Sequence, residues 1–176
     1  MISGMMRAAC VALALGAGTS AFAQSSEPQR VAANTDWSVF EVATPHDCWA
    51  VSAPKETVNS RDGEVVEARR GDILLYVFYR PEANVRGQVA FNGGYPFATD
   101  STVELDVGGT KFELFVDGEF AWPTNAEADA QIVNALKAGA SATVVGRSGR
   151  GTVTTDTFSL LGFTASVEEA ARRCGG

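Results

Sequence analysis

The feature that most constrains this chain is a pair of cysteines, Cys48 and Cys174, which stand 126 positions apart in a sequence of 176 residues. The third cysteine, Cys10, lies in an N-terminal segment that we expect to be removed. In an exported protein an even number of cysteines indicates a disulfide, and two cysteines allow one intramolecular pairing. The chain-entropy model gives a bond that closes so long a loop roughly 5 kcal/mol of stability.

Residues 1–23 are typical of a secretory signal peptide. Arg7 supplies the positive charge, residues 8–17 form the apolar region, and an A-x-A site predicts cleavage between Ala23 and Gln24. The apolar region is too short for a membrane anchor, which needs about 20 residues. A lipidated cysteine would follow the apolar region, whereas Cys10 precedes most of it. We therefore expect a periplasmic or secreted chain, or one peripheral to the cell envelope, with no transmembrane anchor.

A metal site and a reactive thiol are the alternatives to this disulfide, because His46 lies two residues before Cys48. Structural zinc sites usually draw their ligands from spaced pairs, and the sequence has no second pair. A cysteine that is engaged in a disulfide is not a nucleophile. We therefore expect a Cys48–Cys174 disulfide, no metal and no cofactor.

The charge of the chain bears on its partners. The formal net charge is −7, and removal of the leader takes away Arg7 but no acidic residue. An acidic protein repels nucleic-acid phosphate, so nucleic acid is not an expected partner. Hydrophobic residues make up 45% of the chain and charged residues 20%, which is typical of a folded domain.

The mature chain is expected to contain one domain. Residues 24–34 are polar and aperiodic, which predicts a flexible lead-in, and residues 35–176 form the domain. About eight β-forming runs are separated by turn signals, such as Asp62-Gly63 and Gly108-Gly109. The continuous apolar run at 73–79 predicts a strand that is buried on both faces.

Two capping boxes, in which Ser or Thr is followed three residues later by Glu, predict two helices: Thr124 with Glu127, and Ser166 with Glu169. Gly139 is expected to end the first helix. In the second helix, Cys174 falls on the apolar face, together with Val167, Ala170 and Ala171. The whole pattern predicts an all-β fold, an immunoglobulin-like β-sandwich with two short helices.

No motif in the sequence indicates catalysis. A nucleophilic triad or dyad would have to use His46, because it is the only histidine. Ser148 resembles a nucleophile elbow only loosely, since Arg150 stands where the second glycine should be. We expect a protein that is not an enzyme. The alternative is an envelope hydrolase that uses surface carboxylates or His46.

The candidate binding surface is an aromatic loop around Asn92-Gly93-Gly94. Phe91, Tyr95 and Phe97 flank these turn residues, and we expect the loop to be exposed. Two local groups of arginines either bind an anionic group or balance the acidic surface as strand-end charges. They are Arg69, Arg70, Arg80 and Arg86 in one group, and Arg147 and Arg150 in the other.

Three stretches together resemble the invasion-associated locus B family. These are Asp36-Trp37-Ser38-Val39 with Cys48, then Leu136-Lys137-Ala138-Gly139, and then Phe158-Ser159-Leu160-Leu161-Gly162-Phe163-Thr164-Ala165 ahead of Cys174. Their order and spacing match over about 31–174. Many members carry a further cysteine pair before the middle helix, but 112–122 has none here, which indicates a divergent branch.

The resemblance implies a small exported protein of the kind found in alphaproteobacteria, with an immunoglobulin-like sandwich and no established catalytic residues. The family takes its name from host-cell entry by its pathogenic members. We therefore expect a non-enzymatic periplasmic or cell-envelope protein that binds a protein or an envelope component. The alternative that the family name implies is a host-cell adhesion or invasion factor.

Overall fold

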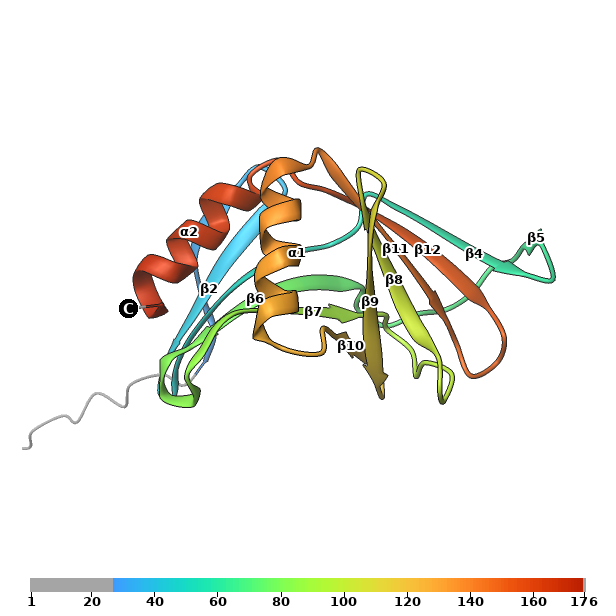
Figure 1. The fold of residues 1–176 in the computed structure, drawn as a ribbon, viewed down its shortest axis with the longest axis horizontal. Helices are drawn as coiled ribbons and strands as arrows, with labels where there is room; N and C mark the ends of the chain where they lie inside the picture. The colour runs from blue at the N-terminus through green and yellow to red at the C-terminus, as the bar shows by residue number, and fades with distance from the viewer. Residues whose placement is uncertain (1–26, 176) are drawn as a thin grey trace, which may run out of the picture.

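The computed structural model describes residues 27–175, so the predicted signal peptide and its cleavage site at Ala23 and Gln24 lie outside the described residues. Within that range, the β-strands form one antiparallel sheet in the order β1-β2-β3-β6-β7-β10-β9-β8-β11-β12-β4-β5 (Figure 1). The strands are β1 (Gln29–Asn34), β2 (Trp37–Ala43), β3 (His46–Ser52), β4 (Glu56–Arg61), β5 (Glu64–Val65), β6 (Leu74–Arg80), β7 (Val85–Asn92), β8 (Thr102–Val107), β9 (Thr110–Asp117), β10 (Phe120–Trp122), β11 (Ser141–Arg147) and β12 (Val153–Ser159).

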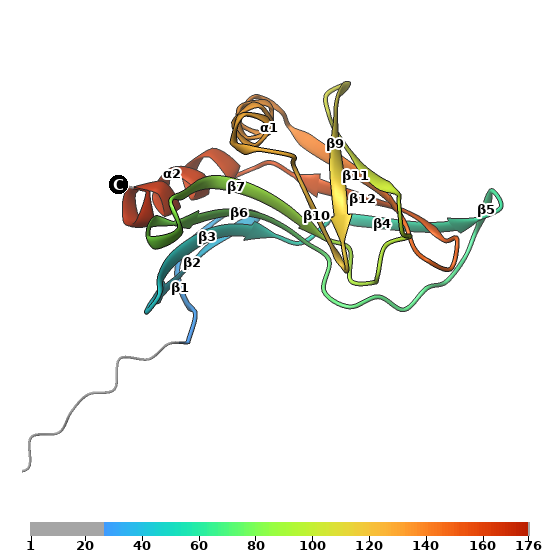
Figure 2. The same cartoon turned by 60° about the horizontal axis from the view of Figure 1, so that its bottom comes forward.

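Two helices cover one face of this sheet. Helix α1 (Ala126–Ala138) packs against β7, and helix α2 (Phe163–Cys174) packs mainly against β3 and β2 (Figure 2). The β4–β5 hairpin lies at the end of the molecule remote from α2 in both views. The expected all-β, sandwich-like fold with two short helices is confirmed, and its immunoglobulin-like connectivity stays a prediction. Among the described residues, no helix has the length and hydropathy needed to cross a membrane.

Several local signals are confirmed. Gly108-Gly109 joins β8 to β9, and Asp62-Gly63 joins β4 to β5, with positive φ at both residues of each turn. The expectation of a flexible lead-in is wrong for 29–34, because these residues pair with β2 as strand β1. Backbone hydrogen bonds to a neighbouring strand outweigh the polar composition of this segment.

The two predicted capping boxes are wrong, although both helices exist. The side chain of Asn125, not Thr124, caps α1 by accepting a hydrogen bond from the Ala128 N–H at 2.9 Å. Helix α2 begins three residues before Ser166, with Gly162 as its N-cap. Ser166 is fully buried within the helix, where its hydroxyl accepts a 3.0 Å hydrogen bond from Asn34.

The predicted disulfide joins the two ends of the fold. Cys48 on β3 is bonded to Cys174 on the last turn of α2, with 5.7 Å between their Cα atoms. Cys174 is buried, as the helical pattern predicts. Trp37 packs edge-to-face on Phe163 with 4.8 Å between ring centroids, so the bridge and this aromatic pair both hold α2 against the sheet.

Strand β6 departs from its predicted burial on both faces. Leu75, Val77 and Tyr79 point into the core, but Tyr76 and Phe78 are only half-buried on the other face. The helices cover the core-facing side. The apolar run at 73–79 is continuous because both faces of β6 carry apolar side chains. The core face is buried, and the outer face is aromatic and partly exposed.

Candidate functional site: an arginine-lined cavity

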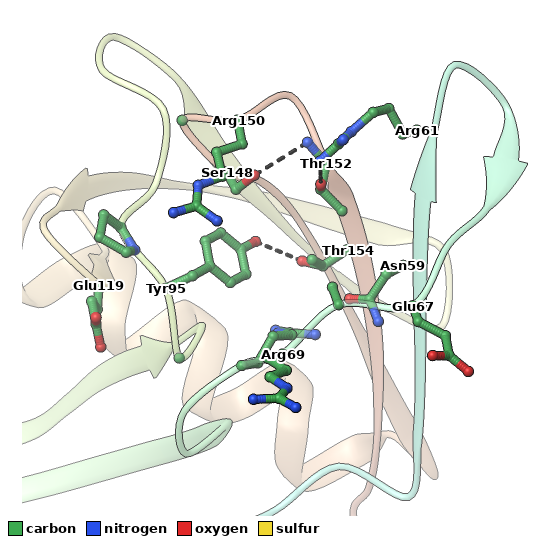
Figure 3. A pocket seen from close by; sticks show the side chains of 15 residues that line it. Asn59, Arg61, Glu67, Arg69, Tyr95, Glu119, Ser148, Arg150, Thr152 and Thr154 are labelled. Atoms are coloured by element: carbon green, nitrogen blue, oxygen red, sulfur yellow. Dashed lines mark hydrogen bonds between the residues drawn. The ribbon is translucent and has the colours of Figure 1, made fainter.

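A cavity of about 520 Å³ opens where β4, β12 and four connecting segments meet (Figure 3). The four are the segment between β5 and β6, the β7–β8 loop, the β9–β10 turn and the β11–β12 turn. The side chains that define the cavity are Asn59, Arg61, Glu67, Arg69, Arg70, Tyr95, Glu119, Ser148, Arg150, Thr152 and Thr154. These residues come from segments far apart in the sequence, so only the folded sheet brings them together.

A buried ion pair forms the base of the cavity. The Arg70 guanidinium donates to both carboxylate oxygens of Asp156, at 2.7 Å and 2.6 Å. Their side chains are 5% and 0% exposed, respectively. Arg70 also donates to the Gly93 carbonyl at 2.9 Å, so this arginine fastens the β7–β8 loop to β12.

Tyr95 forms one wall of the cavity and is held in place from both sides. Its hydroxyl lies 2.6 Å from the Thr154 hydroxyl, and the Arg70 guanidinium lies 5.1 Å from its ring centroid. Burial raises the pKa of Tyr95, so the phenol stays protonated at neutral pH. The wall therefore presents a neutral, fixed aromatic ring to the cavity.

Three further arginines surround the opening. Arg61 donates to the Thr152 hydroxyl at 2.7 Å. Arg69 and Arg150 have no hydrogen bond or ion pair with any other residue in 27–175. Figure 3 places Arg150 beside the Tyr95 ring and draws the Glu67 and Glu119 carboxylates at the margins of the cavity. Unpaired guanidinium groups present planar donor forks that match carboxylate and phosphate oxygens.

Asn59 adds an unsatisfied group to the cavity lining. Its side-chain oxygen is buried without a hydrogen-bond partner among the described residues. A buried polar atom that lacks a partner costs roughly 1–3 kcal/mol.

The predicted aromatic surface is wrong in two of its three residues. Phe91 is 0% and Phe97 7% exposed. Phe91 points into the core from β7, and Phe97 packs on it with 6.1 Å between ring centroids. Gly93 and Gly146 leave room for the Phe97 ring, since a Cβ at either position would lie under 3 Å from it. Tyr95 alone reaches the cavity.

The structure brings together only part of the arginines that the sequence groups. Arg69, Arg70 and Arg150 share the cavity, whereas Arg80 lies over the Phe78 ring and Arg147 is exposed outside the cavity. Sequence reasoning missed Arg61 and Asn59. No local signal could identify them, because they reach the cavity through the pairing of β4 with β12.

His46 lies in a different part of the sheet. Its Nε2 is 3.1 Å from a Glu41 carboxylate oxygen, and one of its ring nitrogens lies within 4.8 Å of both bridged sulfurs. Sulfurs that are bonded to each other offer no thiolate to a metal. Ser148 lies in the β11–β12 turn, where its hydroxyl accepts a hydrogen bond from the Thr152 N–H, so the structure does not bring His46 and Ser148 together.

Comparisons with protein-family models, with curated proteins and with solved structures found no match for this chain.

Proposed function

We propose that this chain is an exported, non-enzymatic binding protein of the periplasm or cell envelope, and that its cavity takes an anionic group of a protein or envelope component. The observation that carries the proposal is the pair of unpartnered arginines, Arg69 and Arg150, beside an open cavity with a fixed base. The kinship with the invasion-associated locus B family is part of the same proposal, and rests on the sequence motifs.

Electrostatics supports this use of the cavity. The chain as a whole carries a net charge of −7. A protein of that charge repels an anion everywhere except where cations gather, so a local arginine group directs an anionic ligand to one place. Because Arg70 is already neutralised by Asp156, the lining carries the positive charges of Arg61, Arg69 and Arg150, and these outnumber the negative charges of Glu67 and Glu119.

The chemistry of the lining favours binding over catalysis. The cavity offers arginine donors and an aromatic wall, whereas a nucleophile would need a base within hydrogen-bond reach. Ser148 has the Thr152 N–H as its partner, and His46 belongs to strand β3.

Titration calorimetry with inorganic phosphate and with N-acetylmuramic acid, a carboxylated envelope sugar, tests the proposal on the oxidised mature chain. The Arg69→Ala, Arg150→Ala double variant should bind at least tenfold more weakly, a loss of about 1.4 kcal/mol. Arg147→Ala is the matched control, because Arg147 is an exposed arginine on β11 outside the cavity. Equal weakening by the control, or no binding of either probe to the unmodified chain, would overturn the proposal.

Crosslinking and affinity capture from the native envelope then identifies the component. The captured species should be lost with the double variant and kept with Arg147→Ala.

A further inference from the structure

Six aromatic side chains form a continuous strip on the face of the sheet that the helices leave open. This aromatic strip consists of Phe40, Trp49, Tyr76, Phe78, Phe120 and Trp122, and each is half-buried. Successive ring centroids lie 5.0 to 6.5 Å apart, from Phe40 through to Trp122. The strip is separate from the arginine-lined cavity, because none of its residues lines that cavity.

Strand register explains why the strip is continuous. Phe40 pairs with Trp49, and Trp49 pairs with Phe78, across β2, β3 and β6. On β7 Gln88 pairs with Phe78, and Ala90, whose small side chain is fully buried, pairs with Tyr76. The rings of β6 and β10 therefore meet above this alanine, at 6.4 Å between Tyr76 and Phe120.

The rings are both accessible and pre-positioned. Three pairs, Phe40–Trp49, Tyr76–Phe78 and Phe120–Trp122, are near-parallel with 5.0 to 5.8 Å between ring centroids. At these separations the stacking is offset, so the two rings of a pair cover each other's faces only in part. Each ring is also restrained by contact with at least one other ring. Binding of a ligand therefore costs little side-chain conformational entropy. From β2 to β10 the strip crosses four strand spacings, or about 19 Å.

Polar and charged groups border the aromatic strip. The Arg80 guanidinium lies 4.3 Å from the Phe78 ring centroid and is held by Asp47 and Gln88. Asn92 uses its side-chain oxygen for the Gly94 N–H, which leaves its amide hydrogens for a ligand. Charges of both signs border the strip, namely Arg30 and Arg80 with Asp47, Asp72 and Asp117.

We propose that the aromatic strip binds a linear, uncharged glycan, with sugar rings lying along it. The C–H faces of pyranose rings carry partial positive charge and pack on the negative faces of aromatic rings. Their hydroxyls need donors and acceptors at the border of the rings, which Arg80, Asp47 and Asn92 supply. Because the bordering charges are mixed, the strip neither attracts nor repels a polymer of one sign, which suits an uncharged chain.

The main rival occupant is a second copy of this chain. A two-fold dimer would lay one strip on another and remove the rings from solvent. If a dimer formed in a concentration-dependent way and was lost when the strip was altered, the strip would be a dimer interface and the glycan proposal would be wrong.

Intrinsic fluorescence tests the proposal on the unmodified protein. Trp49 and Trp122 belong to the strip, whereas Trp37 is 1% exposed in the core. Addition of an N-acetylglucosamine tetramer should shift the emission of the strip tryptophans, and the tetramer should bind at least tenfold more tightly than the monosaccharide because it spans more rings. The Trp49→Phe, Trp122→Phe variant should keep glycan binding in calorimetry but lose the emission change.

Alanine variants of the two tryptophans provide a second test of the proposal. Trp49→Ala and Trp122→Ala should each weaken tetramer binding at least tenfold, with Leu161→Ala as the control because Leu161 is exposed away from the strip. The Arg69→Ala, Arg150→Ala variant should bind the tetramer normally, which separates this site from the cavity. No tetramer binding, binding unaffected in both tryptophan variants, or a strip-dependent dimer by light scattering would each overturn the proposal.

Discussion

Arg70 and Asp156 stand 86 positions apart, yet they form a two-pronged, nearly solvent-free ion pair beneath the arginine-lined cavity. The pair connects the segment before β6 to β12, and Asp156 also accepts a hydrogen bond from Thr57 on β4 at 3.0 Å. Three distant parts of the chain therefore depend on one carboxylate. This makes the base of the cavity a structural element as well as a boundary.

Removal of one partner should destabilise the fold strongly. Arg70→Ala leaves a buried carboxylate without its counter-charge, and Asp156→Ala leaves a buried guanidinium, so each should cost about 3–5 kcal/mol. Denaturant unfolding measures this cost, and replacement of both residues, by Met and Leu, should cost less than either single change. Arg69→Ala, which removes an unpaired neighbour, should stay within about 0.5 kcal/mol. Single-variant costs below 1 kcal/mol would contradict the role assigned to the pair.

The Cys48–Cys174 bridge should contribute a large share of the stability. The Cys48→Ala, Cys174→Ala variant should unfold about 2–5 kcal/mol more easily, as expected for a native disulfide. Thermal unfolding measures the difference, and intact mass after alkylation should reveal two thiols only in reduced protein. Two alkylatable thiols in the untreated protein would refute the bridge.

Gly162 should tolerate no side chain. It has a φ of +91°, and a Cβ there would overlap the backbone carbonyl of Asn34. Gly162→Ala should therefore cost at least about 2 kcal/mol, from backbone strain and steric overlap together. Gly108→Ala provides the comparison, because Gly108 has a φ of +60° and nothing within 4 Å of a Cβ. Gly108→Ala should lower the free energy of unfolding by only about 1 kcal/mol. Equal losses in the two variants would argue against the close approach of Asn34 to Gly162.

The ion pair between Glu41 and Arg173 predicts a pH dependence. The Arg173 hydrogen bond, at 2.8 Å, is the main cause that lowers the pKa of Glu41, and His46 adds to it. Because the folded pKa lies below the unfolded value of about 4.3, the stabilisation is present above that pH and is lost as pH falls through the folded value. Glu41→Gln should cost under 1 kcal/mol at pH 7, since the pair is partly exposed.

Unfolding of both proteins between pH 7 and pH 3 tests this dependence. The stability difference between the unmodified chain and Glu41→Gln should shrink toward zero at the acidic end. A difference that stayed constant across this range would point to lost packing rather than lost charge.

Local signals predicted much of the fold. The Gly108-Gly109 hairpin and the buried position of Cys174 depend on residues that are close in sequence, and both are confirmed. The helix starts were wrong because several residues near each start can cap. Thr124 and Asn125 are adjacent and both suit an N-cap, and the observed hydrogen bond decides for Asn125.

The cavity and the aromatic strip were harder to predict from the sequence than the fold. Periodicity says which residues share a face of a strand, but not which strands are neighbours, so the meeting of Asn59 and Arg61 with Tyr95 could not be predicted. Phe91 and Phe97 were placed outside because their neighbours are turn residues, whereas the glycines there also make space for a buried ring. The alternation within the apolar run at 73–79 was hidden because its outer face is aromatic.

The position of the disulfide in the chain also fixes an order of events. Strands β4 to β12 and both helices lie between its two ends or contain one of them. The Cys48 thiol is therefore without its partner until the last helix has been made, 126 residues later. The bond can form only once the domain has been synthesised as far as Cys174, so a shorter partial chain cannot be closed by it. Until then, Cys48 is the point at which an unfinished copy could become linked to another.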